Sequence, residues 1–405
     1  MGDYDINEVQ PDEISAFVAL RNSIFSGGPV SAEWWRRLYE ASPRAMTGII
    51  ALKCGEAYAA VSYLLRALFL GASAAHAAFA NAVGVSEKAR GAGLGSLVHL
   101  RALDMLPAYA SSLNVIISER QRAYHYYVRN GYVALWVPVT CEWGFDGLEL
   151  RPPQGMELAP GFDLYRSHET ELLALFVDMY GGSAGYYFHE SGWSNPLRGF
   201  HDLNDDSINR GILRSVLLRD ERGIAAYALV RGSRDNGCGQ ILEIACRPGK
   251  AEVARQAFAA ATVAAKDAGA SAVRFWAGPG HPLDAAARAI PGVKLSRAAG
   301  IYGQPLDAPA VAAAAWGDVP CGLNISVLAR YEDSGSAGEV RMGRGREVVL
   351  AMPRPEWVRF VYRRLDLASA RRTGMVSLLA GNEDDFAALA AVAVVPWVYL
   401  GTTYT

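Results

Sequence analysis

The stretch of sequence that decides the fold is VGVSEKARGAGLGS, which runs from Val83 to Ser96. It begins in an apolar segment, residues 80–85, that is typical of a strand, and it leads into an apolar helical pattern that starts at Leu94. Glycines after a strand let the backbone curl so that several N–H groups point to one place, and the following helix adds the positive end of its dipole. Such a nest suits a diphosphate, and Arg90 adds a positive charge at its rim.

Two well-known phosphate-binding patterns do not match this stretch. The glycines at 91, 93 and 95 lack the G-x-G-x-x-G spacing of the dinucleotide fingerprint, and no acidic residue ends a strand about 20 residues later. A P-loop requires Gly-Lys-Ser/Thr after a longer loop, and that sequence is absent here. A glycine-lined turn that binds nothing is the remaining alternative on the turn alone.

A second motif, AYHYYVRNGY, spans residues 123–132 on a predicted short helix that stops at Asn130-Gly131. Together with RGAGLG at 90–95, it resembles the GNAT superfamily of acyl-coenzyme A N-acyltransferases, whose marks are Arg/Gln-x-x-Gly-x-Gly/Ala and Ala-x-x-x-Tyr-x-x-x-Gly-Phe/Tyr. In that family the strand before the first motif opens and pairs its backbone with the pantetheine arm of the coenzyme. The resemblance assigns coenzyme binding to Val83, Gly84, Val85, Arg90, Gly91, Ala92, Gly93, Leu94, Gly95 and Ser96.

Acyl transfer from a thioester to an amine needs a group that takes a proton from the amine and one that protonates the leaving sulfur. Tyr127 stands at the family's tyrosine position near the coenzyme sulfur, so it is the candidate general acid; the alternative is an aromatic residue that only packs. A backbone N–H near Val85 is the expected donor to the developing oxyanion. Arg120 replaces an asparagine that often precedes the family's helix, so coenzyme contacts at that position are expected to differ.

Strand, turn, helix and strand alternate over residues 1–150, and a weaker copy of this order returns over 151–307. The turn of the copy, CRPGKAE at 246–252, has one glycine and a proline that removes an N–H donor, so we expect it not to bind coenzyme. A small C-terminal module over 308–405 follows, and its alanine-rich start at 308–315 is predicted to be a linker. The predicted class is α/β: two tandem GNAT folds, the second degenerate, and a small α+β module.

This three-part layout resembles the enhanced intracellular survival proteins of actinobacteria, which join an active GNAT domain, a degenerate one and a sterol-carrier-like module. In that family the carboxylate at the end of the chain is the base, which implies a catalytic role for the carboxylate of Thr405. The apolar ending PWVYLGTTYT departs from the family's usual ending, and a terminal strand that closes the last module is the alternative. Mycothiol synthase shares the tandem layout but lacks the third module.

Acceptor binding is assigned to three residues. Trp34 and Trp35 lie on an early helix that forms one wall of the acceptor pocket in this fold, with core packing as the alternative. Glu119 follows a predicted strand and could attract a cationic amine, with a solvated surface carboxylate as the alternative. No metal site is expected, because the histidines lack metal-ligand spacing. Arg363-Arg364 and Arg371-Arg372 are expected to be ordinary basic pairs on helix surfaces or ends.

Composition excludes several other classes of protein. The 405 residues carry a formal net charge of −2, with no basic stripe for a nucleic acid, and 51% hydrophobic residues argue against disorder. The five cysteines form no Cys-x-x-Cys pair, so neither a disulfide framework nor a zinc site is expected. With no signal-peptide pattern and no apolar run typical of a membrane span, the expected location is the cytoplasm.

These observations lead to one expected function and two alternatives. We expect an N-acetyltransferase that moves an acetyl group from acetyl-coenzyme A, as co-substrate, to a primary amine of a small polyamine or aminoglycoside-like acceptor by direct attack. One alternative is a natural-product biosynthetic N-acyltransferase that uses another acyl-coenzyme A, and the other is a non-catalytic coenzyme A-binding protein. Neither nucleic acid nor membrane is an expected partner, and a homo-oligomer is left open.

Overall fold

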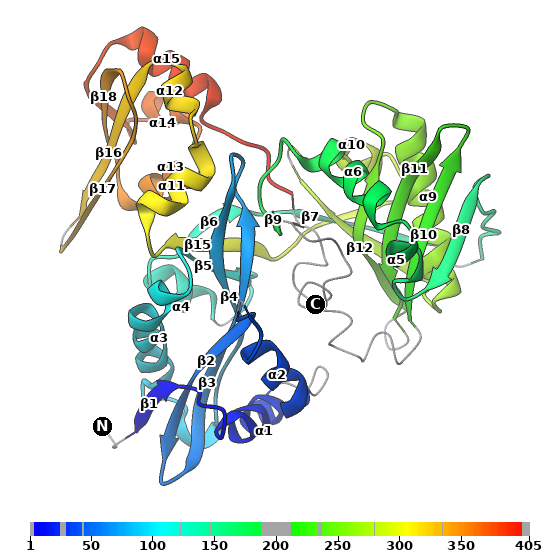
Figure 1. Cartoon of the computed structure of the whole chain (residues 1–405), viewed down its shortest axis with the longest axis horizontal. Coiled ribbons are helices and arrows are strands. Elements are labelled where there is room, and N and C mark those ends of the chain that lie inside the picture. Colours follow the sequence, from blue (N-terminus) through cyan, green and yellow to red (C-terminus); the bar gives the residue numbers. More distant parts are fainter. Residues whose placement is uncertain are drawn as a thin grey trace. The chain divides into compact units, whose positions relative to one another are not determined.

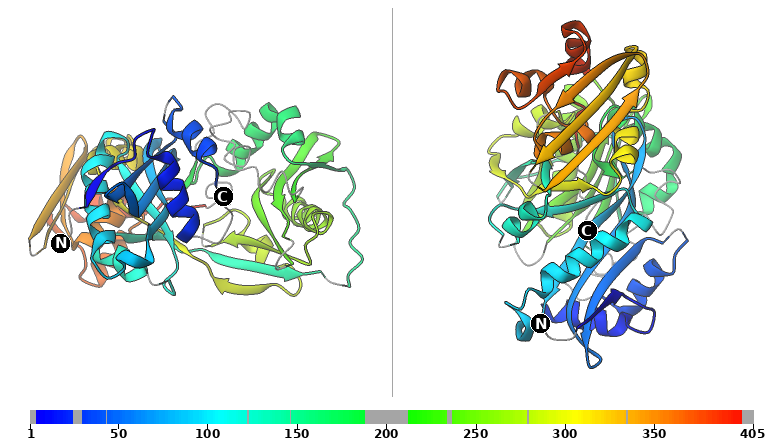
Figure 2. Two further views of the ribbon diagram at one scale, coloured as in Figure 1. Left: turned by 90° about the horizontal axis from the view of Figure 1, so that it is seen from below. Right: turned by 90° about the vertical axis from the view of Figure 1, so that its left-hand side faces the viewer.

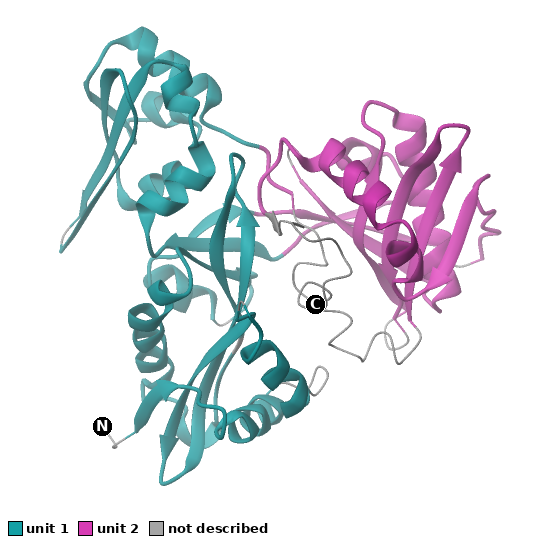
Figure 3. Cartoon of the chain, viewed as in Figure 1, with its two compact units in different colours: residues 1–136, 299–395 teal, residues 137–298, 396–405 magenta. Residues whose placement is uncertain are grey.

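A computed structural model describes residues 4–24, 30–42, 44–121, 123–145, 147–187, 212–233, 237–278, 280–333 and 335–398. The chain divides into two compact units, residues 1–136 with 299–395 and residues 137–298 with 396–405 (Figure 3). Three sheets carry the fold, and mixed α and β elements confirm the predicted class. No helix among the described residues is long and apolar enough to cross a membrane.

The first sheet lies in the first unit and has the strand order β1-β2-β3-β4-β5-β15-β6 (Figure 1). Its neighbours are antiparallel except β4 and β5, which run parallel. Helices α1 and α2 cover one face, and α3 and α4 cover the other (Figure 1). The bounds are β1 Asp5–Glu8, α1 Ile14–Ile24, α2 Ala32–Tyr39, β2 Met46–Lys53, β3 Glu56–Phe69, β4 Ala74–Val85, η1 Glu87–Ala89, α3 Leu94–Met105, η2 Leu106–Ala108, β5 Ser112–Ile117, α4 Tyr124–Arg129, β6 Val133–Trp136 and β15 Gly300–Pro305.

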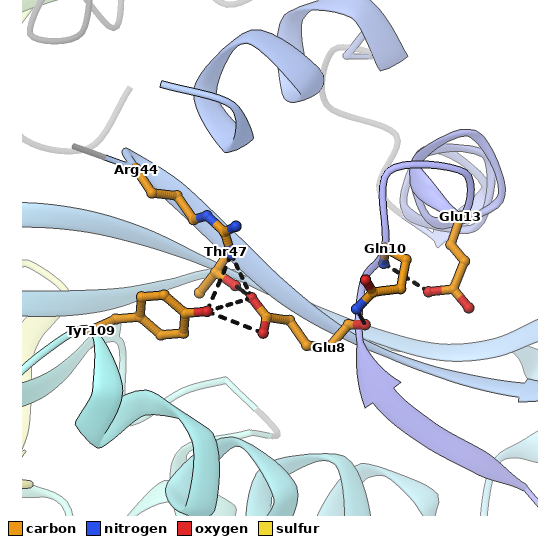
Figure 4. A network of polar contacts seen from close by, with 6 residues as sticks. All are labelled: Glu8, Gln10, Glu13, Arg44, Thr47 and Tyr109. Carbon is orange, nitrogen blue, oxygen red and sulfur yellow. Dashed lines mark hydrogen bonds and ion pairs between the residues drawn. The ribbon is translucent and has the colours of Figure 1, made fainter. Parts of the chain in front are cut away.

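The carboxylate of Glu8 fixes the first strand of this sheet to its surroundings (Figure 4). It accepts hydrogen bonds from Arg44 Nη1 at 2.7 Å, Thr47 Oγ1 at 2.8 Å and the Tyr109 hydroxyl at 3.0 Å. The guanidinium of Arg44 also lies 4.0 Å from the ring centroid of Tyr39. One half-buried carboxylate with three donors thus joins β1 to the start of β2 and to the segment before β5.

The second unit holds a sheet of the same design, with the order β14-β7-β13-β12-β11-β10-β8 (Figure 1). The long helix α9 packs its alanines against one face of this sheet, and α6 contacts β11 and β12. The bounds are β7 Val139–Gly144, β8 Met156–Pro160, α5 Asp163–Ser167, α6 Glu169–Tyr180, β9 Tyr186–Tyr187, β10 Leu213–Asp220, β11 Gly223–Arg231, β12 Cys238–Cys246, α9 Ala251–Asp267, β13 Ala272–Ala277, α10 Asp284–Arg288 and β14 Lys294–Arg297.

The two sheets exchange one strand each. Strand β7, which follows β6 in the sequence, pairs with β13 and β14 of the second sheet. Strand β15, which follows β14, inserts between β5 and β6 of the first sheet. The chain therefore passes between the two units after residues 136 and 298, whereas the sequence analysis places its segment boundaries at 150 and 307.

The C-terminal module is a four-stranded sheet, β17-β16-β18-β19, with five helices; Figure 2 shows the long strands β16 and β17 side by side. The predicted linker at 308–315 is instead helix α11, which is buried on one side and begins where the carboxylate of Asp307 accepts a hydrogen bond from the N–H of Ala310 at 3.0 Å. The bounds are α11 Ala308–Trp316, α12 Val319–Gly322, β16 Ile325–Asp333, β17 Ser336–Gly343, β18 Arg346–Ala351, α13 Arg354–Val361, α14 Leu367–Arg372, β19 Ser377–Ala380 and α15 Glu383–Val392.

The basic pair Arg363-Arg364 follows the end of α13, as one of the two expectations had it, but both side chains bind backbone carbonyls within the first unit. Arg364 Nε donates to the carbonyl of Leu135 at 2.9 Å, and its Nη1 donates to the carbonyl of Val395 at 2.5 Å. Burial lowers the pKa of Arg364 to about 10. Arg363 Nε donates to the carbonyl of Val392 at 2.9 Å. The two guanidiniums satisfy carbonyls that the packing of the module against β6 would otherwise leave unpaired.

Candidate active site

Strand β4 separates from β5 halfway along its length. The two strands pair in parallel only from Ala77 with Ser112 to Ala80 with Val115. β4 continues beside β3 as far as Val85, after a register shift that leaves one extra residue in β4, Asn81. The bulge lies at the point of separation, so the last part of β4 keeps β3 as a neighbour but leaves β5.

The pairing with β3 determines which backbone groups the separation frees. The N–H of Ser86 donates to the carbonyl of Tyr58 at 2.8 Å. Because hydrogen-bonded residues alternate along an antiparallel strand, Gly84 also faces β3, and Val83 and Val85 direct their N–H and C=O groups away from it. These groups point to the side where β5 would continue.

The glycine-rich turn lies between this open strand and α3. Gly91 has φ +86° and Gly93 has φ +74°, a backbone region that disfavours side chains, and a Cβ on either residue would meet no atom within 4 Å. Within the part of the chain that the structure describes, the N–H groups of Gly91, Gly93, Leu94 and Gly95 donate to no backbone carbonyl. These N–H groups at the N-terminus of α3 are what a phosphate nest requires, and whether they bind a ligand stays a prediction.

Arg90 stands at the rim of this turn, where its side chain is exposed and forms an ion pair of 3.2 Å with Glu87. The first turn of α3 lies directly against the open strand, since a Cβ on Gly95 would be 3.5 Å from Cγ2 of Val85. Ala92 lies in the turn and Ser96 in the first turn of α3, where its N–H donates to the carbonyl of Gly93 at 3.0 Å.

A small pocket opens between the separated strand and helices α3 and α4. It brings together residues from both sequence motifs, which lie far apart in the chain. Its lining consists of Val61, Tyr63, Ala80, Val83, Gly95, Val98, His99, Tyr126 and Tyr127.

Two adjacent tyrosines of α4 have different parts in this pocket. Tyr127 is 4% exposed, and burial raises the pKa of its phenol to about 12. The Tyr126 hydroxyl donates to the carbonyl of Gly95 at 2.9 Å, which ties α4 to the first turn of α3. Sequence reasoning missed Tyr126 and His99 as pocket residues, because only the contact between α3 and α4 brings them to the open strand.

The other predicted site residues lie elsewhere. Trp34 and Trp35 are 8% and 2% exposed, and the ring of Trp35 packs against Phe17 and Tyr39 at centroid distances of 4.9 and 5.4 Å. Glu119 is exposed in the loop between β5 and α4. None of these three lines the pocket beside β4. Thr405 lies outside the residues that the structure describes.

Solved structures match the whole chain in this arrangement. A conserved protein of unknown function from Enterococcus faecalis, described as a probable N-acyltransferase, has a TM-score of 0.68 at 11% identity and covers 98% of both chains. A GCN5-related N-acetyltransferase from Anabaena variabilis has a TM-score of 0.66 at 14% identity, covering 98% of this chain and 99% of its own. Eis1 from Mycobacterium abscessus has a TM-score of 0.61 at 16% identity and covers 100% of both chains.

The chain has the tandem GNAT fold. This confirms the GNAT fold that the two motifs implied, and the tandem layout with a C-terminal module that the repeated order of elements implied, because the matches cover 98% and 100% of the chain. No protein-family model and no curated protein sequence matches the chain. The residues that the structure describes contain no group of three or more His, Cys, Asp or Glu side chains that could hold a metal.

The second GNAT fold repeats the open strand. β12 pairs with β13 only from Cys238 to Gln240, and the residue Leu242 forms a bulge against β11. The N–H of Arg247 donates to the carbonyl of Ala225 at 3.0 Å, so by the same alternation Ile244 and Cys246 face away from β11. They occupy the places that Val83 and Val85 have in the first fold.

The end of α6 fills this second gap. The hydroxyl of Tyr180 donates to the carbonyl of Ile244 at 2.5 Å, and the N–H of Cys246 donates to Sδ of Met179 at 3.2 Å. Tyr180 is fully buried. Two of the groups that face this gap, the carbonyl of Ile244 and the N–H of Cys246, thus have side-chain partners, whereas no such partner is found among the described residues for Val83 and Val85.

Proposed function

We propose that this chain is an N-acetyltransferase that transfers the acetyl group of acetyl-coenzyme A to a primary amine. The observation that carries the proposal is the open end of β4, whose free backbone groups at Val83 and Val85 adjoin a nest of free N–H groups at the start of α3. A ligand that joins a diphosphate to a chain of amides matches both features, and coenzyme A is such a ligand.

The residues present fit the coenzyme. The N–H groups around Gly91, Gly93 and Gly95 would hold the diphosphate, with the helix dipole of α3 and the charge of Arg90 as support. The N–H and C=O groups of Val83 and Val85 would pair with the pantetheine amides as a neighbouring strand does. In the second GNAT fold two strand groups bind side chains of α6, and Pro248 removes one N–H donor from the turn, so one site per chain is expected.

In the proposed reaction, the amine nitrogen attacks the thioester carbonyl carbon, a C–N bond forms, and the C–S bond then breaks. A backbone N–H of the open strand near Val85 stabilises the oxyanion between these two events. Tyr127 keeps its proton at neutral pH because burial raises its pKa to about 12, and it donates that proton to the leaving sulfur. The proton that the amine loses goes to a base, which we propose is the carboxylate of Thr405.

The proposed acceptor is a small polyamine or an aminoglycoside-like compound. Glu119, exposed between β5 and α4, would attract such a cation. Trp34 and Trp35 are not part of the proposed acceptor site, because both are buried beside the sheet.

Calorimetric titration of the purified protein with acetyl-coenzyme A tests the proposal. We expect one site per chain, and we expect Gly93→Pro to remove it, because proline lacks the N–H and cannot adopt φ +74°. The circular dichroism spectrum of the variant shows whether the fold persists. Absence of binding to the wild-type protein would refute the proposed function, and a site that survives Gly93→Pro would refute its location.

A further inference from the structure

His99 has a buried nitrogen without a partner beside the proposed coenzyme site. It lies on α3 one turn after Gly95, its side chain lines the pocket, and it is 4% exposed. Within the described residues, Nε2 of His99 has no hydrogen-bond partner. The rings of Tyr126 and Tyr132 lie against the imidazole at centroid distances of 5.6 and 5.7 Å.

Such a nitrogen lowers stability unless something outside the chain satisfies it. Buried polar groups in proteins are nearly always hydrogen-bonded, because leaving one unpaired costs about 1–3 kcal/mol. Burial lowers the pKa of His99 to about 4, so at neutral pH the ring is uncharged and carries one N–H and one lone pair. It can therefore pair with an uncharged donor or acceptor.

We propose that Nε2 of His99 is a binding group for the pantetheine arm of the coenzyme, through a hydrogen bond to one of its amides or its hydroxyl. This inference rests on the proposed function. The pocket that His99 lines also contains Val83 of the open strand and Tyr127, the proposed donor to the sulfur, so it lies along the path of the arm. Amide and hydroxyl groups are the uncharged partners that the arm offers there.

The test compares His99→Leu and His99→Gln with the wild-type protein, using two ligands in calorimetric titrations. Coenzyme A carries the arm, and adenosine 3′,5′-bisphosphate lacks it. We expect His99→Leu to weaken coenzyme A binding about 3- to 10-fold, the usual range for one neutral hydrogen bond, and to leave adenosine 3′,5′-bisphosphate binding unchanged. His99→Gln, which keeps a polar nitrogen near the position of Nε2, should recover part of the loss.

The melting temperature of the unliganded variant separates binding from structural support. Replacing an unsatisfied buried nitrogen with an apolar group of similar size should leave the unliganded protein equally stable or more stable. If His99 only supported the fold, His99→Leu would instead lower the melting temperature and would weaken the binding of both ligands alike.

His281 provides a matched control. It is also 4% exposed with an unpartnered Nε2 among the described residues, but it lies in the second unit and its Nδ1 accepts a hydrogen bond from the N–H of Leu283 at 3.0 Å. His281→Leu should leave the affinity for coenzyme A unchanged. Equal coenzyme A affinity in wild type and His99→Leu would overturn the inference alone, whereas a wild-type protein that binds no coenzyme A would overturn the proposed function with it.

Discussion

The two GNAT folds of this chain contain the same irregular strand in different surroundings. In both, a strand leaves its parallel neighbour at a one-residue bulge, and two alternate residues turn their backbone groups into the gap. In the first, those groups belong to Val83 and Val85 and adjoin a pocket. In the second, they belong to Ile244 and Cys246 and bind Tyr180 and Met179.

The comparison distinguishes the gap, which both GNAT folds have, from the features that a ligand in the gap would need. The gap between the strands follows from the backbone pairing, so it persists in the second fold. What differs is the occupant of the gap and the turn before the next helix, where Pro248 removes an N–H that a phosphate nest needs. Side chains from α6 satisfy the backbone groups that a bound ligand would otherwise satisfy, which stabilises the second fold without a ligand.

The two folds differ in the short helix before β6 and before β14: α4 carries Tyr127, whereas α10 has no tyrosine. The largest expected effect is on the catalytic rate when Tyr127 is replaced. Tyr127→Phe should lower kcat about 100-fold, with little change in KM for acetyl-coenzyme A, because only the leaving sulfur loses its proton donor. Tyr124→Phe on the same helix is the control and should retain activity. With the pKa of Tyr127 near 12, the wild-type rate should show no fall attributable to this group as pH rises to about 10. If Tyr127→Phe retained the wild-type activity, Tyr127 would have only a packing role.

An intermediate effect is expected at the two turns. Gly93 and Gly249 have φ +74° and +76°, and a Cβ on either would meet nothing within 4 Å, so Gly93→Ala and Gly249→Ala should strain the backbone equally, by about 1–2 kcal/mol. Only Gly93→Ala should weaken coenzyme A binding, about 10-fold, because relief of the strain redirects the N–H groups of the nest. Calorimetry and thermal melting of both variants measure the two effects. Equal coenzyme A affinities for Gly93→Ala and Gly249→Ala would contradict a binding role for the first turn.

The smallest effect on binding is expected in the second gap. Tyr180→Phe should destabilise the protein by about 1–2 kcal/mol, because the buried carbonyl of Ile244 loses its donor, and should leave coenzyme A binding unchanged. Denaturant unfolding and calorimetry measure the two quantities.

The combined variant Tyr180→Ala with Met179→Ala tests what silences the second fold. Removing both side chains opens the gap but leaves the turn with Pro248, so one coenzyme site per chain should remain. Two sites would show that the side chains of α6 alone prevent binding there.

Local sequence was enough to predict the glycine turn between β4 and α3. The glycines at 91, 93 and 95 require particular backbone angles, and the helix that starts at Leu94 directly follows them, so the feature is built by neighbours in the chain. The resemblance of the second motif to the GNAT family implied that Tyr127 lies near the coenzyme site, and in the structure Tyr127 lines the pocket beside β4.

Features made by contacts between distant segments were decided only by the tertiary structure. Strand exchange between the sheets depends on which edge β7 and β15 meet, and a strand's own sequence specifies its pattern of exposure but not its partner. The burial of Arg363 and Arg364 and the orphan nitrogen of His99 likewise depend on what packs around them. The glycines and the helix that follows them predicted a turn suited to a phosphate, and the resemblance to the GNAT family implied the opened strand. What occupies each gap depends instead on tertiary packing, because Tyr180 and Met179 of α6 bind backbone groups in the second gap.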